Sequence, residues 1–434
     1  LGEALQRAEQ EPLDDERRAN WREMARAWRM ATALPAELVE RRSLATAHCE
    51  HAWRSQRPAN DWAGFAAHLR TVLALARQEA RLLSDATGLP PYDALLDQHE
   101  PGMRVAEVAR LFDDLRQWLP DLVRRVTQRQ AGEPVLRPRG PFDTQAQKHL
   151  CERVMQLLQF DFTHGRLDVS AHPFSGGAPE DVRLTTRFRE NDFLLSLMST
   201  IHETGHGRYE QNLPARWLDQ PLGKARSMGI HESQSLFFEM QLAAHPGFVR
   251  LLSPLLTEAF GPDPAYAPDN LQRLLTRVVP GRIRVEADEV SYPAHVMLRF
   301  DIERALFEEG AEVDDIPVLW DSGMRDLLGI DTRGDYRDGA MQDIHWPSGA
   351  FGYFPCYTLG AMYAAQWAAS MRRERPDLDA CIAAGDLAPV FGWLRERIWQ
   401  PASRWTTDEL ARRASGETLN PAHFRAHLTQ RYLA

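Results

Sequence analysis

Residues 191–206 read NDFLLSLMSTIHETGH, an apolar stretch that leads directly into the pattern His-Glu-x-x-His. The apolar spacing predicts a helix, and residues four apart on a helix share one face. His202 and His206 can therefore bind one metal ion, and Glu203 can accept a proton from an attacking water. Zinc is the favoured ion, because imidazole and carboxylate ligands around one open position are typical of catalytic zinc. The alternative is a surface helix that carries two histidines by chance.

Gly205 lies inside this predicted helix. A glycine there lowers helix propensity by about 1 kcal/mol. A residue without a side chain also leaves room for a close neighbour, so Gly205 favours a packed site over an exposed helix.

A catalytic zinc needs a third protein ligand. Tyr209 and Asn212 occupy the positions where a metzincin has its glycine and third histidine, which excludes that class. Glu232 opens the next predicted helix after enough chain for a loop and a return, and we take it as the third ligand. Glu239 follows two turns later on the same face and is either a partner for a ligand histidine or a surface acid. His231 is the lesser alternative as a ligand.

Most of the remaining chain has apolar residues at helical spacing, bounded by proline and glycine. Two short stretches instead alternate between polar and apolar residues, 166–170 and 181–188, with a turn rich in glycine and proline over 172–179 between them. They predict a small antiparallel sheet inside one helical domain that spans residues 1–434. The predicted helices before this sheet cover residues 13–33, 35–55, 61–87, 105–130 and 144–160.

The composition excludes some classes of protein. The net charge is −10 and no basic domain stands out, which argues against nucleic-acid binding and gives no reason to expect binding to anionic membranes. No apolar run approaches the ~20 residues that span a bilayer. The four cysteines are scattered without a CxxC pair, which favours free thiols in a reducing compartment. We therefore expect a cytoplasmic protein.

Several blocks of sequence, taken together, resemble the carboxypeptidase Taq family, the thermostable metallocarboxypeptidases. In chain order they are HPF at 172–174, DVRLTT at 181–186, HETGH at 202–206, HESQ at 231–234, IRVEADEVSYP at 283–293, QDIHW at 342–346 and GAFGYFPCY at 349–357. Each block is weakly specific alone, and the set is highly specific.

The resemblance implies a mainly α, neurolysin-like zinc peptidase fold, with a small antiparallel β-sheet beside a deep active-site groove. It implies peptide substrates, stepwise release of C-terminal amino acids with broad side-chain tolerance, Zn²⁺ with Co²⁺ as the candidate substitute, and a homodimer. Family members carry further helices that help to roof the groove, and the resemblance places them before Leu1 of this chain.

A peptidase must stabilise a tetrahedral oxyanion. The resemblance implies that a histidine and a tyrosine from a late segment do this, and His345, Tyr353 and Tyr357 are the candidates. Packing of these aromatic residues in the core is the alternative. His295 lies in a predicted helix over 292–309 and is more typical of a structural histidine, whereas His172 has no assigned role.

An exopeptidase must also hold the substrate's terminal carboxylate, and arginine does this through a bidentate contact. Arg284 is the first candidate, with Arg183 and Arg337 as alternatives. A structural ion pair of Arg284 with Glu286 or Asp288 is the competing interpretation.

Two other functions remain open from the sequence. One is an oligopeptidase that cleaves internal bonds of short peptides with the same metal site. The other is a helical binding protein that has kept the motif but lost the reaction.

Overall fold

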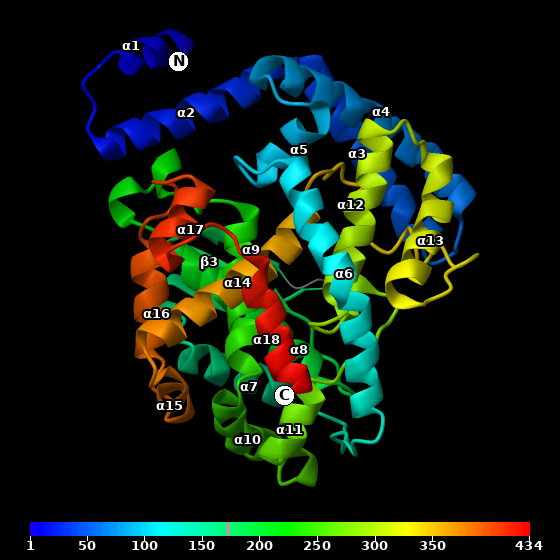
Figure 1. The fold of residues 1–434 in the computed structure, drawn as a ribbon, viewed down its shortest axis with the longest axis vertical. Coiled ribbons are helices and arrows are strands. Elements are labelled where there is room, and N and C mark those ends of the chain that lie inside the picture. Colours follow the sequence, from blue (N-terminus) through cyan, green and yellow to red (C-terminus); the bar gives the residue numbers. More distant parts are fainter. Residues whose placement is uncertain (171–173) are drawn as a thin grey trace. The chain divides into compact units, whose positions relative to one another are not determined.

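The computed structural model describes residues 1–170 and 174–434, so His172 and Pro173 of the HPF block lie outside the described residues. The chain forms two compact units. Unit 1 comprises Leu1–Gln128 and Val278–Thr358, and unit 2 comprises Arg129–Arg277 and Leu359–Ala434. Both are mainly helical, as predicted (Figure 1). The prediction of a single domain stays a prediction.

The helices of unit 1 begin and end at the signals in the sequence. Helix α4, for example, is capped by Asp61, whose carboxylate accepts a hydrogen bond from the Gly64 amide, and it ends at Gly88 in the left-handed conformation. Helix α6 continues through Pro120. The helices of this unit are α1 (Gly2–Glu9), α2 (Asp15–Ala33), α3 (Ala36–Gln56), α4 (Trp62–Thr87), α5 (Pro91–His99), α6 (Val105–Gln130), α12 (Tyr292–Glu308), α13 (Ile316–Leu328) and the start of α14 (Pro355–Glu374).

A buried carboxylate joins three segments inside unit 1. Glu303, on α12, accepts hydrogen bonds from the Tyr92 hydroxyl, the Trp346 indole and the Gly352 amide. Burial raises the pKa of Glu303 to about 7, although these three donors oppose that shift. Trp346 and Gly352 lie outside helices and strands. The hydrogen bonds to Glu303 hold their segment against α5 and α12.

Unit 2 surrounds α8 (Phe193–Glu210), the helix that carries the His-Glu-x-x-His pattern. Asp192 caps α8 by accepting a hydrogen bond from the Leu195 amide. The other helices and strands of this unit are α7 (Thr144–Leu157), β1 (Gly165–Val169), β2 (Phe174–Ala178), β3 (Asp181–Thr186), α9 (Met228–Leu236), the π-helical segment η4 (Phe237–Ala243), α10 (Pro246–Phe260), α11 (Pro268–Leu275), the rest of α14, α15 (Leu378–Ala383), α16 (Ala388–Leu394), the π-helical segment η8 (Arg395–Trp399), α17 (Thr407–Ser415) and α18 (Pro421–Leu433).

The small sheet of unit 2 exists, but its strand pairing was predicted incorrectly. The order is β1-β3-β2, with β1 parallel to β3 and β2 antiparallel to it, so the sheet is mixed rather than antiparallel. The stretch expected to be only a turn contains β2, which reaches β3 through the short connection Pro179-Glu180. Because this hairpin occupies one edge of β3, β1 pairs with the other edge.

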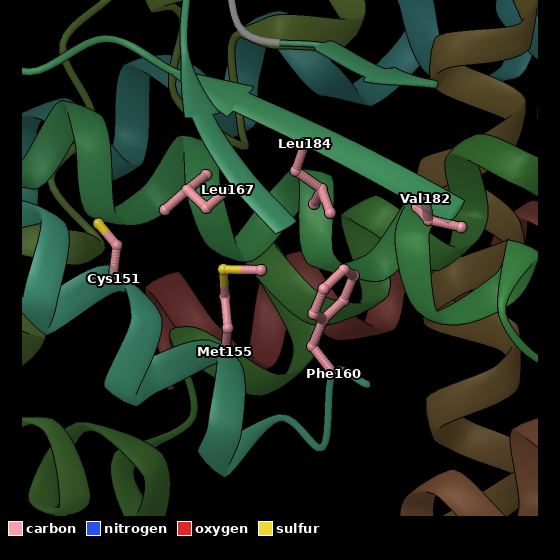
Figure 2. Packing of buried hydrophobic residues seen from close by; sticks show 6 residues of the cluster. All are labelled: Cys151, Met155, Phe160, Leu167, Val182 and Leu184. Carbon is pink, nitrogen blue, oxygen red and sulfur yellow. The ribbon is translucent and has the colours of Figure 1, made fainter. Parts of the chain in front are cut away.

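One face of this sheet packs against helical residues. Leu167, Val182 and Leu184 of the sheet form a buried cluster with Cys151 and Met155 of α7 and with Phe160 (Figure 2). Among the described residues, no helix has the length and apolarity that a membrane span requires.

Helices α8 and α9 approach each other at backbone distance. A Cβ atom added to Gly205 would lie 2.5 Å from the Gln234 carbonyl oxygen and 2.6 Å from the Ser235 Cα. Such distances are too short for any side chain, so only glycine permits this approach. The expectation that Gly205 leaves room for a neighbour is confirmed, and the neighbour is the backbone of α9.

We predict that Gly205→Ala destabilises unit 2 despite the higher helix propensity of alanine. Overpacking against a backbone costs about 1–3 kcal/mol, and about 1 kcal/mol corresponds to ~2–4 °C for a unit of this size. Thermal unfolding should show a Tm several degrees lower.

Gly207→Ala, on the same helix, is the matched control. Its Cβ would meet the side chains of Phe160, Leu184 and Val182, which can shift, so its effect should be smaller. Equal Tm values for the two variants would contradict the requirement for glycine at position 205.

Candidate metal centre

Three predicted ligands converge in unit 2. One candidate ligand atom from each of His202, His206 and Glu232 lies within 4.8 Å of the other two. The Nε2 atoms of His202 and His206 lie 3.8 and 3.4 Å from the two carboxylate oxygens of Glu232. Two imidazole nitrogens and one carboxylate form a donor set that zinc takes in catalytic sites. The residues present therefore fit a catalytic zinc ion.

The ring of His202 is supported from behind by Glu239. The Nδ1 atom of His202 lies 2.8 Å from Glu239 Oε2, which leaves Nε2 for the metal-binding side. Glu239 lies in η4, where the α-helical hydrogen-bonding pattern of α9 gives way to a π-helical one. Of the two interpretations of Glu239, the contact with a ligand histidine is the one that the geometry supports.

His231 lies beside the ligand set rather than within it. Its Nδ1 atom is 2.6 Å from Nδ1 of His206, and its Nε2 atom is 2.8 Å from Glu210 Oε1. Both ring nitrogens are therefore engaged on the side of His206 that faces away from Glu232. This geometry favours Glu232 over His231 as the third ligand.

Helix α9 is fixed around Glu232 by close packing and by two indole hydrogen bonds. A Cβ atom on Gly360 of α14 would lie 2.8 Å from Cβ and Cγ of Glu232. Trp367 donates to the Ser233 hydroxyl, and Trp399 donates to the Gln234 side-chain oxygen. The HESQ block thus provides the candidate ligand and two anchors that hold its helix.

The two histidines of the site differ in their preference for positive charge. Burial opposes protonation of His202, but the carboxylates of Glu232 and Glu239 outweigh it and raise the pKa of His202 to about 10. Burial, with neighbouring His231, lowers the pKa of His206 to about 4, although Glu232 opposes this shift. The pKa of Glu232 is lowered: burial raises it, but the surrounding histidines prevail. The carboxylates that favour the protonated form of His202 would also attract a divalent cation.

Glu203, the candidate base, is buried next to these groups and is 8% exposed. Burial raises its pKa to about 7; Glu232 and Glu239 add to the rise, whereas His202 and His231 oppose it. A pKa near the operating pH suits a group that accepts and returns a proton. A bound cation would shift it back toward the ionised form.

The candidate oxyanion donors lie together in unit 1. His345 Nε2 is 2.8 Å from the Tyr357 hydroxyl, and the rings of Tyr353 and Tyr357 are 5.4 Å apart. Burial and neighbouring Arg284 lower the pKa of His345 to about 3, so its imidazole is neutral. Tyr353 lies in the loop before α14 and Tyr357 in the first turn of that helix. These residues belong to a different unit from the metal-ligand set.

Arg284 joins this second cluster but is held by other protein groups. Its Nε and Nη2 atoms both donate to Asp343 Oδ1, and its Nη1 atom donates to the Tyr292 hydroxyl. The guanidinium also lies 4.7 Å from the ring centre of Tyr357. The competing interpretation, an ion pair of Arg284 with Glu286 or Asp288, named other acids than the structure shows, because Arg284 pairs with Asp343.

The two alternative arginines have exposed partners. Arg183 donates to Asp181 on β3, and Arg337 donates to neighbouring Asp338. Neither takes part in a buried network, and the choice of Arg284 among the three stays a prediction.

Sequence reasoning missed three residues that shape these clusters. Glu210 lies four residues after His206, and its spacing on α8 was the one available signal. Asp343 stands within the QDIHW block, but its two arginine partners, Arg284 and Arg299, are distant in sequence. Gly360 gave no signal, since its role depends on a helix more than a hundred residues away.

Comparisons with known proteins show the family to which this chain belongs. Residues 1–432 match the family model described as carboxypeptidase Taq (M32) metallopeptidase. The chain is 37% identical to thermostable carboxypeptidase 1 of Thermus thermophilus, over 100% of this chain and 87% of that protein.

Solved structures give the same result. Metallocarboxypeptidase 1 of Trypanosoma cruzi superposes with a TM-score of 0.95 at 47% identity, over 97% of this chain and 85% of that one. A carboxypeptidase of Pyrococcus furiosus superposes with a TM-score of 0.94 at 34% identity, over 99% and 86% of the two chains. The predicted family and fold class are confirmed, and the chain belongs to the carboxypeptidase Taq (M32) family of metallopeptidases and is a metallocarboxypeptidase.

Proposed function

We propose that this metallocarboxypeptidase uses zinc and releases C-terminal amino acids one at a time, with broad tolerance for the side chain removed. The observation that carries the proposal is the convergence of His202, His206 and Glu232 within 4.8 Å. Broad tolerance and Co²⁺ as a substitute metal come from the family resemblance.

The proposed reaction divides the work between the ion and the protein. A zinc ion bound by His202, His206 and Glu232 would supply a Lewis acid for water activation and carbonyl polarisation. Glu203 accepts the proton of the attacking water at a carboxylate oxygen and passes it to the leaving amine. The raised pKa of Glu203, caused mainly by burial, supports this role because it makes both transfers accessible near neutral pH.

We assign the oxyanion contact to His345 with Tyr353 and Tyr357. Burial and Arg284 hold the imidazole of His345 neutral by lowering its pKa. One donor of the His345–Tyr357 pair is used in the contact between the two residues. The other donor of the pair and the Tyr353 phenol are the groups that we propose for the oxyanion, and they add no charge to the ground state. The short contact between His345 and Tyr357 supports their action as a pair.

We retain Arg284 as the proposed anchor for the substrate's terminal carboxylate. Three of its contacts are already made by Asp343 and Tyr292, and a guanidinium has five N–H donors. Two of its N–H donors take no part in these contacts, and the residue is 5% exposed. The Asp343 carboxylate holds the guanidinium plane in one orientation, which favours recognition over a freely moving side chain.

The tolerance and direction of cleavage can be read from a peptide ladder. The zinc-loaded protein should shorten a mixed-sequence peptide from its C-terminus, with products that differ by one residue in mass spectrometry. The same peptide with an amidated C-terminus should stay intact. Internal fragments from the amidated peptide would favour the oligopeptidase alternative, and no cleavage of either peptide would favour a binding protein.

Glu203→Gln should retain zinc and lose turnover, because the amide has the same size but cannot accept the water's proton. We expect kcat to fall about 10²- to 10⁴-fold, with the zinc content measured by atomic absorption unchanged. The contrasting variant is Glu232→Ala, which should lose zinc together with activity. Full turnover of Glu203→Gln would show that Glu203 is not the base. Full zinc occupancy of Glu232→Ala would show that Glu232 is not a zinc ligand.

Arg284→Lys tests the carboxylate anchor, since lysine keeps the charge but loses the bidentate geometry. A charge-assisted hydrogen bond contributes about 1.5–3 kcal/mol, so KM for free-carboxylate peptides should rise about 10- to 100-fold with little change in kcat. Arg337→Lys, at the exposed pair with Asp338, is the control and should leave KM unchanged. A lower Tm with an unchanged KM for Arg284→Lys would show that Arg284 has only a structural role.

We also propose a cytoplasmic homodimer. Three of the four cysteines are buried free thiols and the fourth is partly buried, which is compatible with a reducing compartment. The dimer follows from the resemblance alone.

A further inference from the structure

The two proposed ligand histidines are supported differently. His202 contacts the carboxylate of Glu239 directly through Nδ1. His206 instead contacts His231, and His231 contacts the carboxylate of Glu210. A carboxylate thus stands behind each ligand ring, but on the His206 side a second imidazole lies between the two.

The chain of contacts behind His206 is compact and built by two helices. His206 and Glu210 lie one turn apart on α8, and His231 on α9 packs between them, with its ring 4.7 Å from that of His206. The ring of Tyr209 lies 5.4 Å from His231 on another side. The imidazole of His231 is therefore held in place by packing as well as by hydrogen bonds.

The direction of the hydrogen bonds follows from the chemistry of the last member. An ionised carboxylate can only accept, so His231 donates to Glu210 through Nε2. A neutral imidazole has one N–H, which means that Nδ1 of His231 must accept. His206 must then donate through its own Nδ1, and its Nε2 atom, on the Glu232 side, carries a lone pair.

We infer that Glu210 is a positioning residue that acts through His231 to hold Nε2 of His206 in the form that can bind a metal. Without the carboxylate, His231 can carry its proton on Nδ1 and donate toward His206. His206 would then accept through Nδ1 and carry its own proton on Nε2, where no metal can bind. This inference rests on the proposed role of His206 as a ligand.

The test uses the full chain without metal and measures the Kd for Zn²⁺ by competition with a chelator at one fixed pH. Glu210→Ala should raise the Kd about 10- to 100-fold, the usual effect of losing a partner behind a ligand. Glu210→Gln should retain most of the affinity, because its amide oxygen still accepts from His231. Glu258→Ala removes a carboxylate of unit 2 that pairs with Arg153 on the surface and should leave the Kd unchanged.

A second variant separates hydrogen-bond direction from simple charge. In His231→Asn, the amide oxygen can occupy the place of Nδ1 and accept from His206 without help from Glu210. Adding Glu210→Ala to His231→Asn should therefore have no further effect on the Kd, a non-additivity that a double-mutant cycle detects. Glu210→Ala alone should change the visible spectrum of the Co²⁺-loaded protein. When Glu210→Ala is added to His231→Asn, the spectrum should stay the same as for His231→Asn alone.

Three outcomes would overturn the inference. A wild-type Kd and Co²⁺ spectrum for Glu210→Ala would remove the role of Glu210. Equal losses in the Gln and Ala variants, or an equal loss in the His231→Asn background, would show that Glu210 acts through its charge. His206→Ala distinguishes failure of this inference from failure of the proposed function. If His206→Ala binds Zn²⁺ as tightly as the wild type, His206 is not a ligand and the proposed metal site itself fails.

Discussion

The contact between the backbones of α8 and α9 at Gly205 is the constraint on which the metal-ligand set depends. His202 and His206 come from one helix and Glu232 from the other, and their side chains are short. The close approach of the two helices at Gly205 accompanies the convergence of these three side chains. Gly360 continues this arrangement on the other side of α9, where it leaves room for the side chain of Glu232 itself. The chemistry of the centre thus depends on two residues that have no functional groups.

The electrostatic environment depends on this close packing. Burial alone would neutralise the histidines and protonate the acids. At His202 the neighbouring carboxylates outweigh burial and raise the pKa of the imidazole. At His206 burial prevails and lowers the pKa, and neighbouring His231 adds to this shift. The second cluster, in unit 1, has the opposite character. There Arg284 and Arg299 share one carboxylate, Asp343. Burial, with these two arginines, lowers the pKa of the neighbouring His345.

Local signals in the sequence were sufficient for the helices and for the pattern on α8. Asp61 and Gly88 mark both ends of α4, and the spacing of His202 and His206 needs no tertiary information. Strand pairing was not predictable in the same way, because β1 and β3 are joined through β2 and their relative direction depends on non-local contacts. The role of Gly360 and the partnership of Arg284 with Asp343 also arise only when distant segments pack. Glu232 is an intermediate case. Its spacing from His206 suggested it as the third ligand, and in the structure its carboxylate lies with His202 and His206.

The contact between Glu239 and His202 depends on the number of residues in the π-helical segment η4. Glu239 lies in this segment, where each turn contains more residues than an α-helical turn, and its carboxylate reaches His202 from there. A π-helical turn is equivalent to one residue inserted into an α-helix. Deleting Phe238, the one residue between Phe237 and Glu239, would remove the inserted residue and restore the α-helical repeat, so Glu239 would leave its present position behind His202. The support behind His202 is thus a matter of residue count as well as residue type, and an in-frame deletion could remove it while every acidic and histidine side chain remained in the chain.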